Sequence, residues 1–395
     1  MISLKGSRLC RDQVLLIIVI FRIILSSLPR FVKALEMITA VRVICFAILL
    51  SVLSFRAWVV KALSEILRFT SFFTPVAGLA VVFFCYDGFC VTNSVAVLQK
   101  HFESIAKDAN GKVGVAVELL ETKESALLNG QEKFPMQSVY KLPVGMAVLH
   151  QVDEGTLRLE QLVRVTTNDF VTKMQHSPIR DAHPLGAELS VSNLLQQMIS
   201  ESDGTACDVL LRLLDGPASV DHFLRKLGVS NVVVATTEKE MGQDELVQYR
   251  NWATPEGMTE LLGMLHEGRG LSVPSRRMLL QFLTETSTGP QRIRGLLPAG
   301  TQVAHKTGSS RTVDKLTRAT NDAGIVTLPD GRHLAIAVFV SDSLADDITR
   351  EAVIARISRA AWDYWTGGLS SANPAAFLEL RSTTKAANPL TAGAR

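Results

Sequence analysis

Strand-like segments stand at both ends of a long helical stretch, and this order restricts the possible folds. KVGVAVELLET, from residue 112, alternates and is rich in valine, and the strand-like SALLNGQEKFPM follows it after a polar turn. Strand patterns return only after residue 300, in TQVAHKTGS, NDAGIVTLPDG and HLAIAVFVSD. The Asp330-Gly331 pair between the last two predicts a hairpin. We therefore expect the strands of both ends to pair in one antiparallel, five-stranded sheet.

The sequence between these strands is helical in pattern and long enough to form a lobe of its own. SVYKLPVGMAVLHQVDEG is apolar for most of its length, which predicts a buried helix. Helices before and after the strands, in residues 95–109 and 351–365, are expected to flank the sheet. The predicted fold is α+β, with an all-helical lobe and the active site in the cleft between lobe and sheet. Apolar residues recur at helical spacing in LSVSNLLQQMISESD, ACDVLLRLLD, ASVDHFLRKLG, TPEGMTELLGMLHEG and PSRRMLLQFLTET.

The apolar content is concentrated in residues 1–92, which contain three long apolar stretches. The third, residues 69–86, contains no charged residue and follows basic sequence, as an export signal or uncleaved membrane anchor does. A buried core segment is one alternative, and a true start codon near residue 60 is another. We expect residues 1–92 to be this apolar segment, 93–366 the catalytic domain and 367–395 a disordered tail.

Charge and cysteine content exclude several classes of function. The net charge of +3 gives no reason to expect a nucleic-acid partner. Cys207 is the one cysteine of the catalytic domain, so this domain has no internal disulfide, and Cys207 is expected to be a small buried side chain. The histidines are scattered, and His176 and His183 lack metal-ligand spacing. We expect neither a metal nor a cofactor.

Ser138 and Lys141 stand three residues apart at the start of the apolar helix. A serine hydroxyl is a weak nucleophile at neutral pH because its proton must leave as it attacks, so it needs a base in reach. Residues at this spacing share one helix face. A lysine in a dry site near another cation can become neutral and accept the proton. The alternative is that Ser138 only caps the helix.

Two further short motifs raise the likelihood of catalysis over capping. Ser202, Asp203 and Gly204 follow in SESDGTACD, and Lys306, Thr307 and Gly308 lie in the valine-rich VAHKTGSS. The order S-x-x-K, S-D-x and K-T-G resembles the serine β-lactamases and penicillin-binding proteins. Asp203 and His305 are expected to be structural.

The segment ATTEKEMGQDELVQYRNWATPEG, residues 235–257, has no clear helical or strand period. It resembles the long active-site loop of class A β-lactamases, which carries the deacylating glutamate. Glu238 matches that glutamate by position, and Glu240 is the alternative. The phrases PMQSVYKL, QYRNW, AHKTG and ATNDAGIVTLPDGR are most similar to the extended-spectrum, cephalosporin-hydrolysing branch of class A. The resemblance covers about residues 95–365.

The resemblance implies a role for each matched residue. Ser138 would attack the lactam carbonyl and become acylated, while Lys141 takes part in its activation. Ser202 would pass a proton to the leaving nitrogen. Glu238 would orient and deprotonate the water that hydrolyses the acyl-enzyme. Whether the lysine or the glutamate is the acylation base is disputed for the family.

Substrate binding is implied for the strand that carries the third motif. The backbone N–H groups of Ser138 and Ser309 would form the oxyanion hole. Lys306 and Thr307, in the K-T-G motif completed by Gly308, would hold the substrate carboxylate. An arginine would help them.

The position of that arginine in this chain differs from its position in many relatives. Ala323 stands at the strand position where they carry it. Arg292, in QRIRGLLPAG, is the alternative donor found in other branches, and Arg294 is also possible.

Three departures from the family pattern concern substrate binding and deacylation. Gly204 replaces an asparagine that contacts the substrate's side-chain amide. Gly242 stands where an asparagine often holds the deacylating water, and Thr236 interrupts a common Arg-x-Glu pattern. Deacylation is the step that these changes affect most.

The sequence thus predicts an exported class A serine β-lactamase that hydrolyses penicillins and cephalosporins. The expected partner is the β-lactam alone, bound by a monomer that is periplasmic or secreted. An inner-membrane anchor through the N-terminal segment is the alternative location. Two other functions stay open: a D-alanyl-D-alanine peptidase (a penicillin-binding protein), and a membrane-tethered β-lactam sensor.

Overall fold

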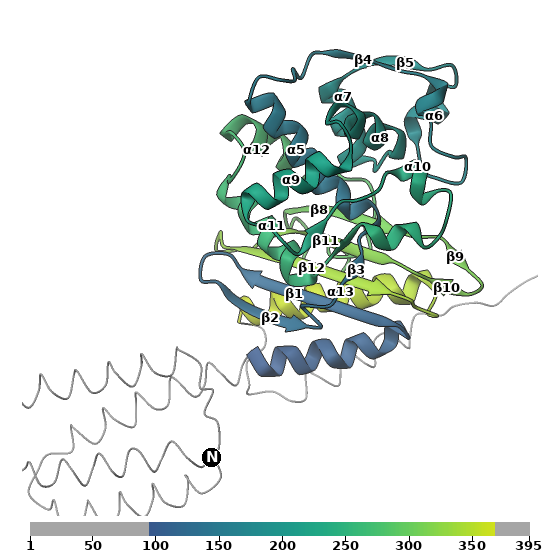
Figure 1. Cartoon of the computed structure of the whole chain (residues 1–395). Coiled ribbons are helices and arrows are strands. Elements are labelled where there is room, and N and C mark those ends of the chain that lie inside the picture. Colours follow the sequence, from purple (N-terminus) through teal and green to yellow (C-terminus); the bar gives the residue numbers. More distant parts are fainter. Residues whose placement is uncertain (1–94, 368–395) are drawn as a thin grey trace, which may run out of the picture. The chain divides into compact units, whose positions relative to one another are not determined.

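The computed structural model describes residues 95–367 of the 395-residue chain (Figure 1). The predictions for the N-terminal apolar stretches and for the tail therefore lie outside the described residues. Between residues 95 and 367, no helix combines the length and apolar character that crossing a bilayer requires.

The predicted sheet is confirmed, with five strands that all pair antiparallel. The two N-terminal strands form one side of it and the three C-terminal strands form the other. In spatial order the strands are β2 (Glu124–Leu128), β1 (Lys112–Leu119), β12 (His333–Ser341), β11 (Thr320–Thr327) and β8 (Val303–Ser309).

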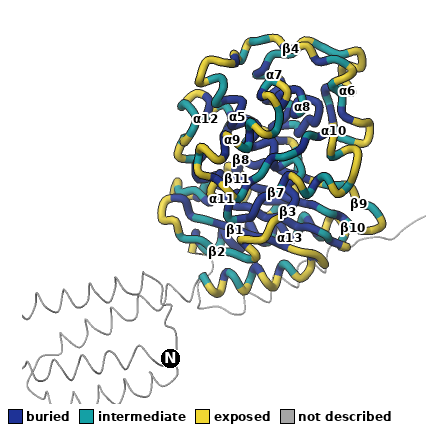
Figure 2. The backbone as a smooth tube through the Cα atoms, in the orientation of Figure 1, coloured by how far each residue is buried: buried dark blue, intermediate teal, exposed yellow. Residues whose placement is uncertain are grey.

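Both faces of the sheet are buried, which explains why its strands are apolar along most of their length. In β12, Ala335, Ala337 and Phe339 belong to one core, while Ile336 and Val338 belong to the other. This is the period of two that a strand imposes. Figure 2 shows the sheet as the buried layer of the domain.

Two helices cover one face of the sheet, as predicted. The first is helical over residues 95–106, and the second is α13 (Asp347–Trp365). Leu98 and Phe102 of the first helix share a core with Val353 and Ile357 of α13. Asp346 caps α13 by accepting the backbone N–H of Thr349.

The other face packs against the helical lobe, which is also as predicted. Its central helix, α5 (Lys141–Asp153), is buried from its first residue through Leu149. Gly145 permits this, since a Cβ there would lie 3.1 Å from the side chain of Ile199. The other long helices of this side are α7 (Val191–Ser200), α8 (Gly204–Leu213), α9 (Pro217–Leu227), α11 (Pro255–Glu267) and α12 (Val273–Thr284).

The expected second strand is shorter than its pattern suggested. It ends at Leu128 because Asn129 has a left-handed backbone, with φ of 50°, and Asn129 Nδ2 donates to Val113 O. The chain then enters a separate small sheet, in which β3 (Phe134–Pro135) pairs with β7 (Trp252–Ala253) and β7 with β6 (Val232–Val233).

Short elements complete the described residues. Residues 235–257 showed no clear period in the sequence. They contain the short helices at Glu238–Met241 and Val247–Arg250 as well as β7. The remaining elements are η2 (Lys107–Ala109), η3 (Gln137–Tyr140), β4 (Leu162–Val165), η4 (Thr167–Asp169), α6 (Pro178–Ala182), β5 (Ala187–Ser190), α10 (Glu238–Met241), η5 (Val247–Arg250), β9 (Thr312–Val313) and β10 (Leu316–Thr317).

Candidate active site

Ser138 and Lys141 lie in direct contact at the start of α5. Ser138 is in the 3₁₀ helix η3, whose three-residue turn places residues i and i+3 above one another. Lys141 Nζ donates to Ser138 Oγ at 3.0 Å and to the carbonyl oxygen of Ser202 at 2.7 Å. Gln137, immediately before the serine, has a φ of 47°. Such backbone strain in a non-glycine residue is typical of functional sites.

Glu238 completes a buried chain of contacts from Ser138 through Lys141. Its Oε1 lies 2.9 Å from Lys141 Nζ, and both side chains are buried. Burial acts to lower the pKa of Lys141, but the charge and hydrogen bond of Glu238, together with nearby acidic groups, raise it overall. Lys141 is therefore protonated at neutral pH, because Glu238 stands beside it and not the second cation that would favour a neutral amine.

Ser202 lies between the two lysines. Lys306 Nζ donates to Ser202 Oγ at 2.8 Å and to Thr307 O at 3.1 Å. Burial and then the charge of Lys141 lower the pKa of Lys306 well below its ordinary value. The backbone of Ser202 is strained, with a φ of 61°. Of the two lysines, Lys306 is therefore the one whose pKa is lowered.

Strand β8 approaches the nucleophile closely at Gly308. A Cβ on Gly308 would lie 3.0 Å from the backbone nitrogen of Ser138 and would also meet Met136 O. Only glycine fits here without displacing one of the two segments. Asn321 of β11 holds the segment before the serine, because its Nδ2 donates to Met136 O at 3.1 Å and to Pro135 O at 2.7 Å.

Arg292 lies against the end of β8, whereas Arg294 does not. The guanidinium of Arg292 donates to Gly308 O at 3.2 Å and to Ser309 Oγ at 2.7 Å, and it is ion-paired with Glu351 at 3.1 Å. Arg294 donates to Val303 O, at the other end of the same strand. A positive charge is therefore held next to the K-T-G motif.

The remaining positions named from the motif also lie at β8. Ala323 pairs with Lys306 across the sheet. Thr307 Oγ1 lies 2.5 Å from Thr288 Oγ1. His305, which is buried, points to Asp322, with 2.9 Å from Nδ1 to the carboxylate. Side chains alternate across a strand, so His305 belongs to the structural side and not to the side of Lys306.

The short helix α10 presents Glu238, and Asp208 of α8 holds its first turn. The carboxylate of Asp208 accepts the backbone N–H of Glu238 at 2.8 Å and that of Lys239 at 2.9 Å. Burial, and then the charge of Glu238, raise the pKa of Asp208 to about 7. Glu240 turns away into a capping box with Thr237. Of the two glutamates considered, only Glu238 reaches Lys141.

The two glycines that depart from the family pattern lie close to Glu238. A Cβ on Gly204 would lie 3.2 Å from His176 O and 3.5 Å from Glu238 Cγ, so there is little room for a side chain. A Cβ on Gly242 would overlap the carboxamide of Gln175. Gln175 Nε2 donates to Glu238 O at 2.5 Å and lies 3.4 Å from Glu238 Oε2.

Asp203 has the structural role that we expected. It caps α8 by accepting the N–H of Ala206 at 2.8 Å, and it also accepts the N–H of Ile179 at 2.7 Å. Ser177 Oγ donates to the same carboxylate at 3.1 Å. These bonds fix the start of α8 and therefore the backbone of the neighbouring Ser202.

Sequence reasoning missed three residues that support the site. Gln175, Asp208 and Asn321 contact the segments that carry Glu238 and Ser138. Asp208 is four residues after Gly204 on α8, so helical spacing from the second motif could have identified it. No comparable signal marks the other two.

The arrangement suits acyl transfer. A hydroxyl, a carboxylate and two ammonium-bearing side chains converge, namely Ser138, Glu238, Lys141 and Lys306. The cationic groups favour an anionic substrate and oppose a metal ion. These residues combine a nucleophile, a base and positive charge around one point.

Comparison with known proteins agrees with this chemistry. A model described as the β-lactamase enzyme family matches residues 97–365. The extended-spectrum β-lactamase PER-1 of Pseudomonas aeruginosa is 41% identical over 301 residues, which are 76% of this chain and 97% of PER-1. The β-lactamase VEB-1 of the same organism is 37% identical over 265 residues, or 67% of this chain and 88% of VEB-1.

Solved structures show the same fold. The TLA-1 extended-spectrum β-lactamase is 42% identical, with a TM-score of 0.67, and the match covers 69% of this chain and 99% of TLA-1. A β-lactamase from Chitinophaga pinensis is 47% identical, with a TM-score of 0.66 and coverage of 67% and 98%. A class A β-lactamase from Bacteroides cellulosilyticus is 35% identical, with a TM-score of 0.66.

Proposed function

The chain belongs to the β-lactamase enzyme family, as a relative of the extended-spectrum class A enzymes, and we propose that Ser138 is the nucleophile with which it opens β-lactams. The reaction is hydrolysis of the lactam amide, which confers resistance to these antibiotics. The substrates that we propose are penicillins and cephalosporins. The observation that carries the assignment is the chain of contacts from Ser138 through Lys141 to Glu238, at 3.0 and 2.9 Å.

In the acylation step, Ser138 Oγ attacks the lactam carbonyl carbon. Its proton passes to Glu238 through a water molecule, because Lys141 is already protonated in the resting pair and cannot accept a proton. Lys141 instead orients the hydroxyl and stabilises the charge that develops on Oγ. A positioned base of this kind contributes roughly 10²–10⁴-fold to the rate.

The carbonyl oxygen receives two backbone hydrogen bonds in this proposal, from Ser138 and Ser309. The close approach of Gly308 to the backbone nitrogen of Ser138 supports it, since the two segments must be adjacent to share one oxygen. One such donor is worth about 10²–10³ in rate in a protease.

The leaving nitrogen takes its proton from Ser202. Because Lys306 Nζ donates to Ser202 Oγ, the hydroxyl hydrogen of Ser202 is free to point toward the substrate. Lys306, whose pKa is lowered, resupplies Ser202. The proton that Glu238 took from Ser138 returns to this pair by way of Lys141, so Glu238 is again a free carboxylate before deacylation. Lys306, Thr307 and Arg292 bind the substrate carboxylate.

Deacylation reverses the direction of proton transfer at the serine. Glu238 removes a proton from water, which attacks the ester carbonyl, and the proton finally returns to Ser138. Gln175 substitutes for the asparagine that Gly242 lacks, because its amide lies at the carboxylate of Glu238. Gly204 leaves the side-chain amide of the substrate without a partner from this position.

Turnover of a chromogenic cephalosporin tests the proposal. We expect many turnovers per enzyme molecule for the wild type and none for Ser138→Ala. Stable acylation of Ser138 without turnover would instead indicate the peptidase. Acylation without turnover, together with a response that needs the membrane segment, would indicate the sensor. Rapid hydrolysis by residues 95–366 expressed alone would exclude the sensor.

We also propose that the enzyme acts as an exported monomer, periplasmic or secreted, with the apolar residues 69–86 as its signal or membrane anchor. The charge-free run of this stretch and the basic sequence before it support export. Cell fractionation with β-lactamase activity as the marker tests the location. Light scattering of the purified enzyme tests the monomer. Activity confined to the cytoplasm would contradict the proposed location.

A further inference from the structure

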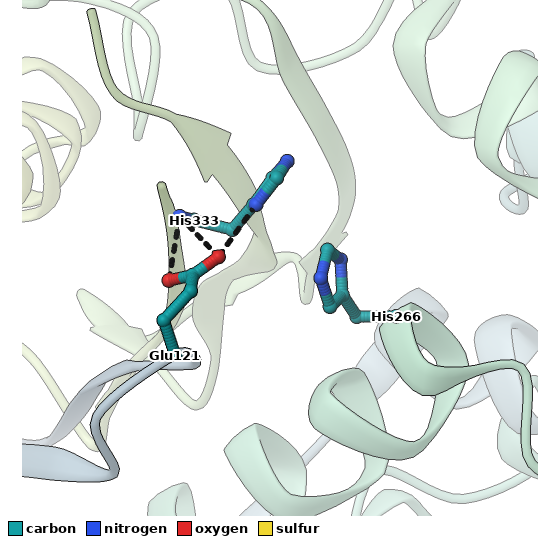
Figure 3. Close-up of side chains that lie close together, drawn as sticks. All are labelled: Glu121, His266 and His333. Atoms are coloured by element: carbon teal, nitrogen blue, oxygen red, sulfur yellow. Dashed lines mark hydrogen bonds and ion pairs between the residues drawn. The ribbon is translucent and has the colours of Figure 1, made fainter. Parts of the chain in front are cut away.

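One carboxylate and two imidazoles gather at the surface, away from the catalytic residues (Figure 3). Glu121 lies in the turn after β1, His266 in the last turn of α11, and His333 is the first residue of β12. Each offers one donor atom, and these three atoms all lie within 4.8 Å of one another. Residues more than 200 positions apart in the sequence thus form one cluster.

Hydrogen bonds already hold two of the three side chains together. The carboxylate of Glu121 lies 2.8 Å from His333 Nδ1 and accepts the backbone N–H of His333 at 3.0 Å. These two bonds fix the carboxylate of Glu121 beside the imidazole of His333.

His266 faces this pair from the helix. Its ring centroid lies 4.3 Å from that of His333 (Figure 3). Lys123, close by in the same turn as Glu121, is neutralised by ion pairs with Glu118 and Glu267, each at 3.2 Å.

We infer that Glu121, His266 and His333 form a binding site for a divalent transition-metal ion, zinc in the first instance. Two imidazoles and one carboxylate are a ligand set that zinc accepts, with water in the fourth position. Nickel and copper also prefer imidazole, and the calcium ion does not. The sequence could not reveal this site, because metal-ligand spacing detects only ligands that lie near one another along the chain.

The geometry needs a small adjustment to hold the ion. Zinc binds nitrogen and oxygen at about 2.0–2.2 Å, so two ligand atoms on one tetrahedral ion stand about 3.4 Å apart. The three donor atoms lie within 4.8 Å of one another, so they must move closer by up to about 1.4 Å. Glu121 is exposed and both histidines are half-buried, so rotation about their side-chain bonds can close the gap. Where the ion replaces the hydrogen of the Glu121–His333 bond, a proton is released.

The site would stabilise the domain without taking part in hydrolysis. It connects three elements: the β1–β2 turn, α11 and β12. On β11, Thr327 pairs with His333 of β12, and Ala323 pairs with Lys306 of β8. Thr327 and Ala323 are four residues apart. At about 3.3 Å per residue this places His333 about 13 Å along the sheet from Lys306. Zinc should therefore raise the melting temperature and leave kcat unchanged.

Zinc binding by the full-length chain, first stripped with EDTA, tests the inference. Isothermal titration calorimetry with zinc chloride gives the stoichiometry, and thermal melts with and without zinc give the stabilisation. His266→Ala is the main variant because His266 makes no hydrogen bond to Glu121 or His333. His222→Ala is the matched control, since His222 is an exposed histidine on another helix. Cysteines in residues 1–92 can bind zinc as well, so the result is the difference between proteins.

We expect the wild type and His222→Ala to bind one more equivalent of zinc than His266→Ala, and to melt at a higher temperature with zinc than without it. Glu121→Gln should bind about tenfold more weakly. Hydrolysis of a cephalosporin at wild-type rates by all three variants shows that each is folded. Equal stoichiometry and an equal thermal shift in the wild type and in folded His266→Ala would overturn the inference.

Discussion

The carboxamide of Gln175 occupies the space that a side chain on Gly242 would need. Gly242 therefore does not simply remove a polar side chain, because Gln175 fills the same space. The loop before α6 supplies an amide to Glu238, and Thr172 fixes the orientation of that amide by donating from its backbone N–H to Gln175 Oε1 at 3.2 Å. The carboxylate that we propose for deacylation is therefore contacted from outside its own segment.

Removal of this amide should slow deacylation. For Gln175→Ala we expect kcat to fall about tenfold, equivalent to about 1.4 kcal/mol, which is within the range of a hydrogen bond to a charged group. Stopped-flow measurement of acylation and deacylation should assign the loss to deacylation. Gln243→Ala, at an exposed glutamine in the segment that carries Glu238, is the control. An equal loss in both variants would contradict a specific role for Gln175.

The two positions should be coupled. Gly242→Asn places a side chain against Gln175, so we expect it to lower both kcat and the melting temperature. The double variant Gln175→Ala/Gly242→Asn gives the asparagine room and should recover part of the activity. A double-mutant cycle measures this coupling. Strictly additive effects would mean that the two side chains do not share one space.

Glu238→Ala should trap the acyl-enzyme. Loss of the base should slow deacylation by roughly 10²–10⁴-fold. Intact-mass spectrometry after mixing with a cephalosporin should then show the covalent adduct on the whole enzyme population. Glu240→Ala is the control, because the carboxylate of Glu240 bonds to Thr236 and Thr237 and does not reach Lys141. Unchanged turnover in Glu238→Ala would require another base.

Asp208 should make stability depend on pH. Its folded pKa of about 7 lies above its ordinary value of 3.8, so between these values the folded protein binds a proton that the unfolded chain has lost. Stability from this group is therefore present at low pH and is lost as the pH rises through about 7. Relative to Asp208→Asn, the wild type should lose on the order of 2 kcal/mol between roughly pH 5 and pH 8.

Thermal or urea unfolding at the two pH values measures this difference. Asp215→Asn is the matched control, because Asp215 is exposed at the end of the same helix. The pH dependence of the control should follow the wild type. If Asp208→Asn follows it as well, another group is responsible.

Arg292 and Arg294 should differ in their effect on KM. Arg292→Ala removes the charge beside Gly308 and Ser309, so we expect KM for carboxylate-bearing substrates to rise about tenfold. Arg294→Ala removes a bond to Val303 O at the far end of the strand and should lower stability with little change in KM. Steady-state kinetics on one penicillin and one cephalosporin compares them. The reverse pattern would move substrate binding to Arg294.

The sheet and the long helices could be predicted from the sequence because their patterns extend over many residues. β12, for example, is apolar from Leu334 to Val340 and follows an Asp-Gly turn, and both features came out as expected. Short elements could not be predicted. The helix α10 has four residues and β7 has two, too few for either period to appear.

The catalytic residues could be identified from their motifs, but their charges could not. The charge of Lys141 depends on Glu238, which lies almost a hundred residues later and contacts it only after folding. The role of Gln175 depends on the absence of a side chain at Gly242, and no local pattern connects those positions.

The catalytic groups come from both parts of the domain: Ser138, Ser202 and Glu238 from the helical side, and Lys306 from β8. Alignment of these groups depends on how the two parts dock, a property that circular dichroism does not measure. Mild denaturant that loosens the docking should therefore abolish catalysis while the helical signal is still intact. For this enzyme, loss of activity would indicate separation of two folded parts and not the unfolding of either part.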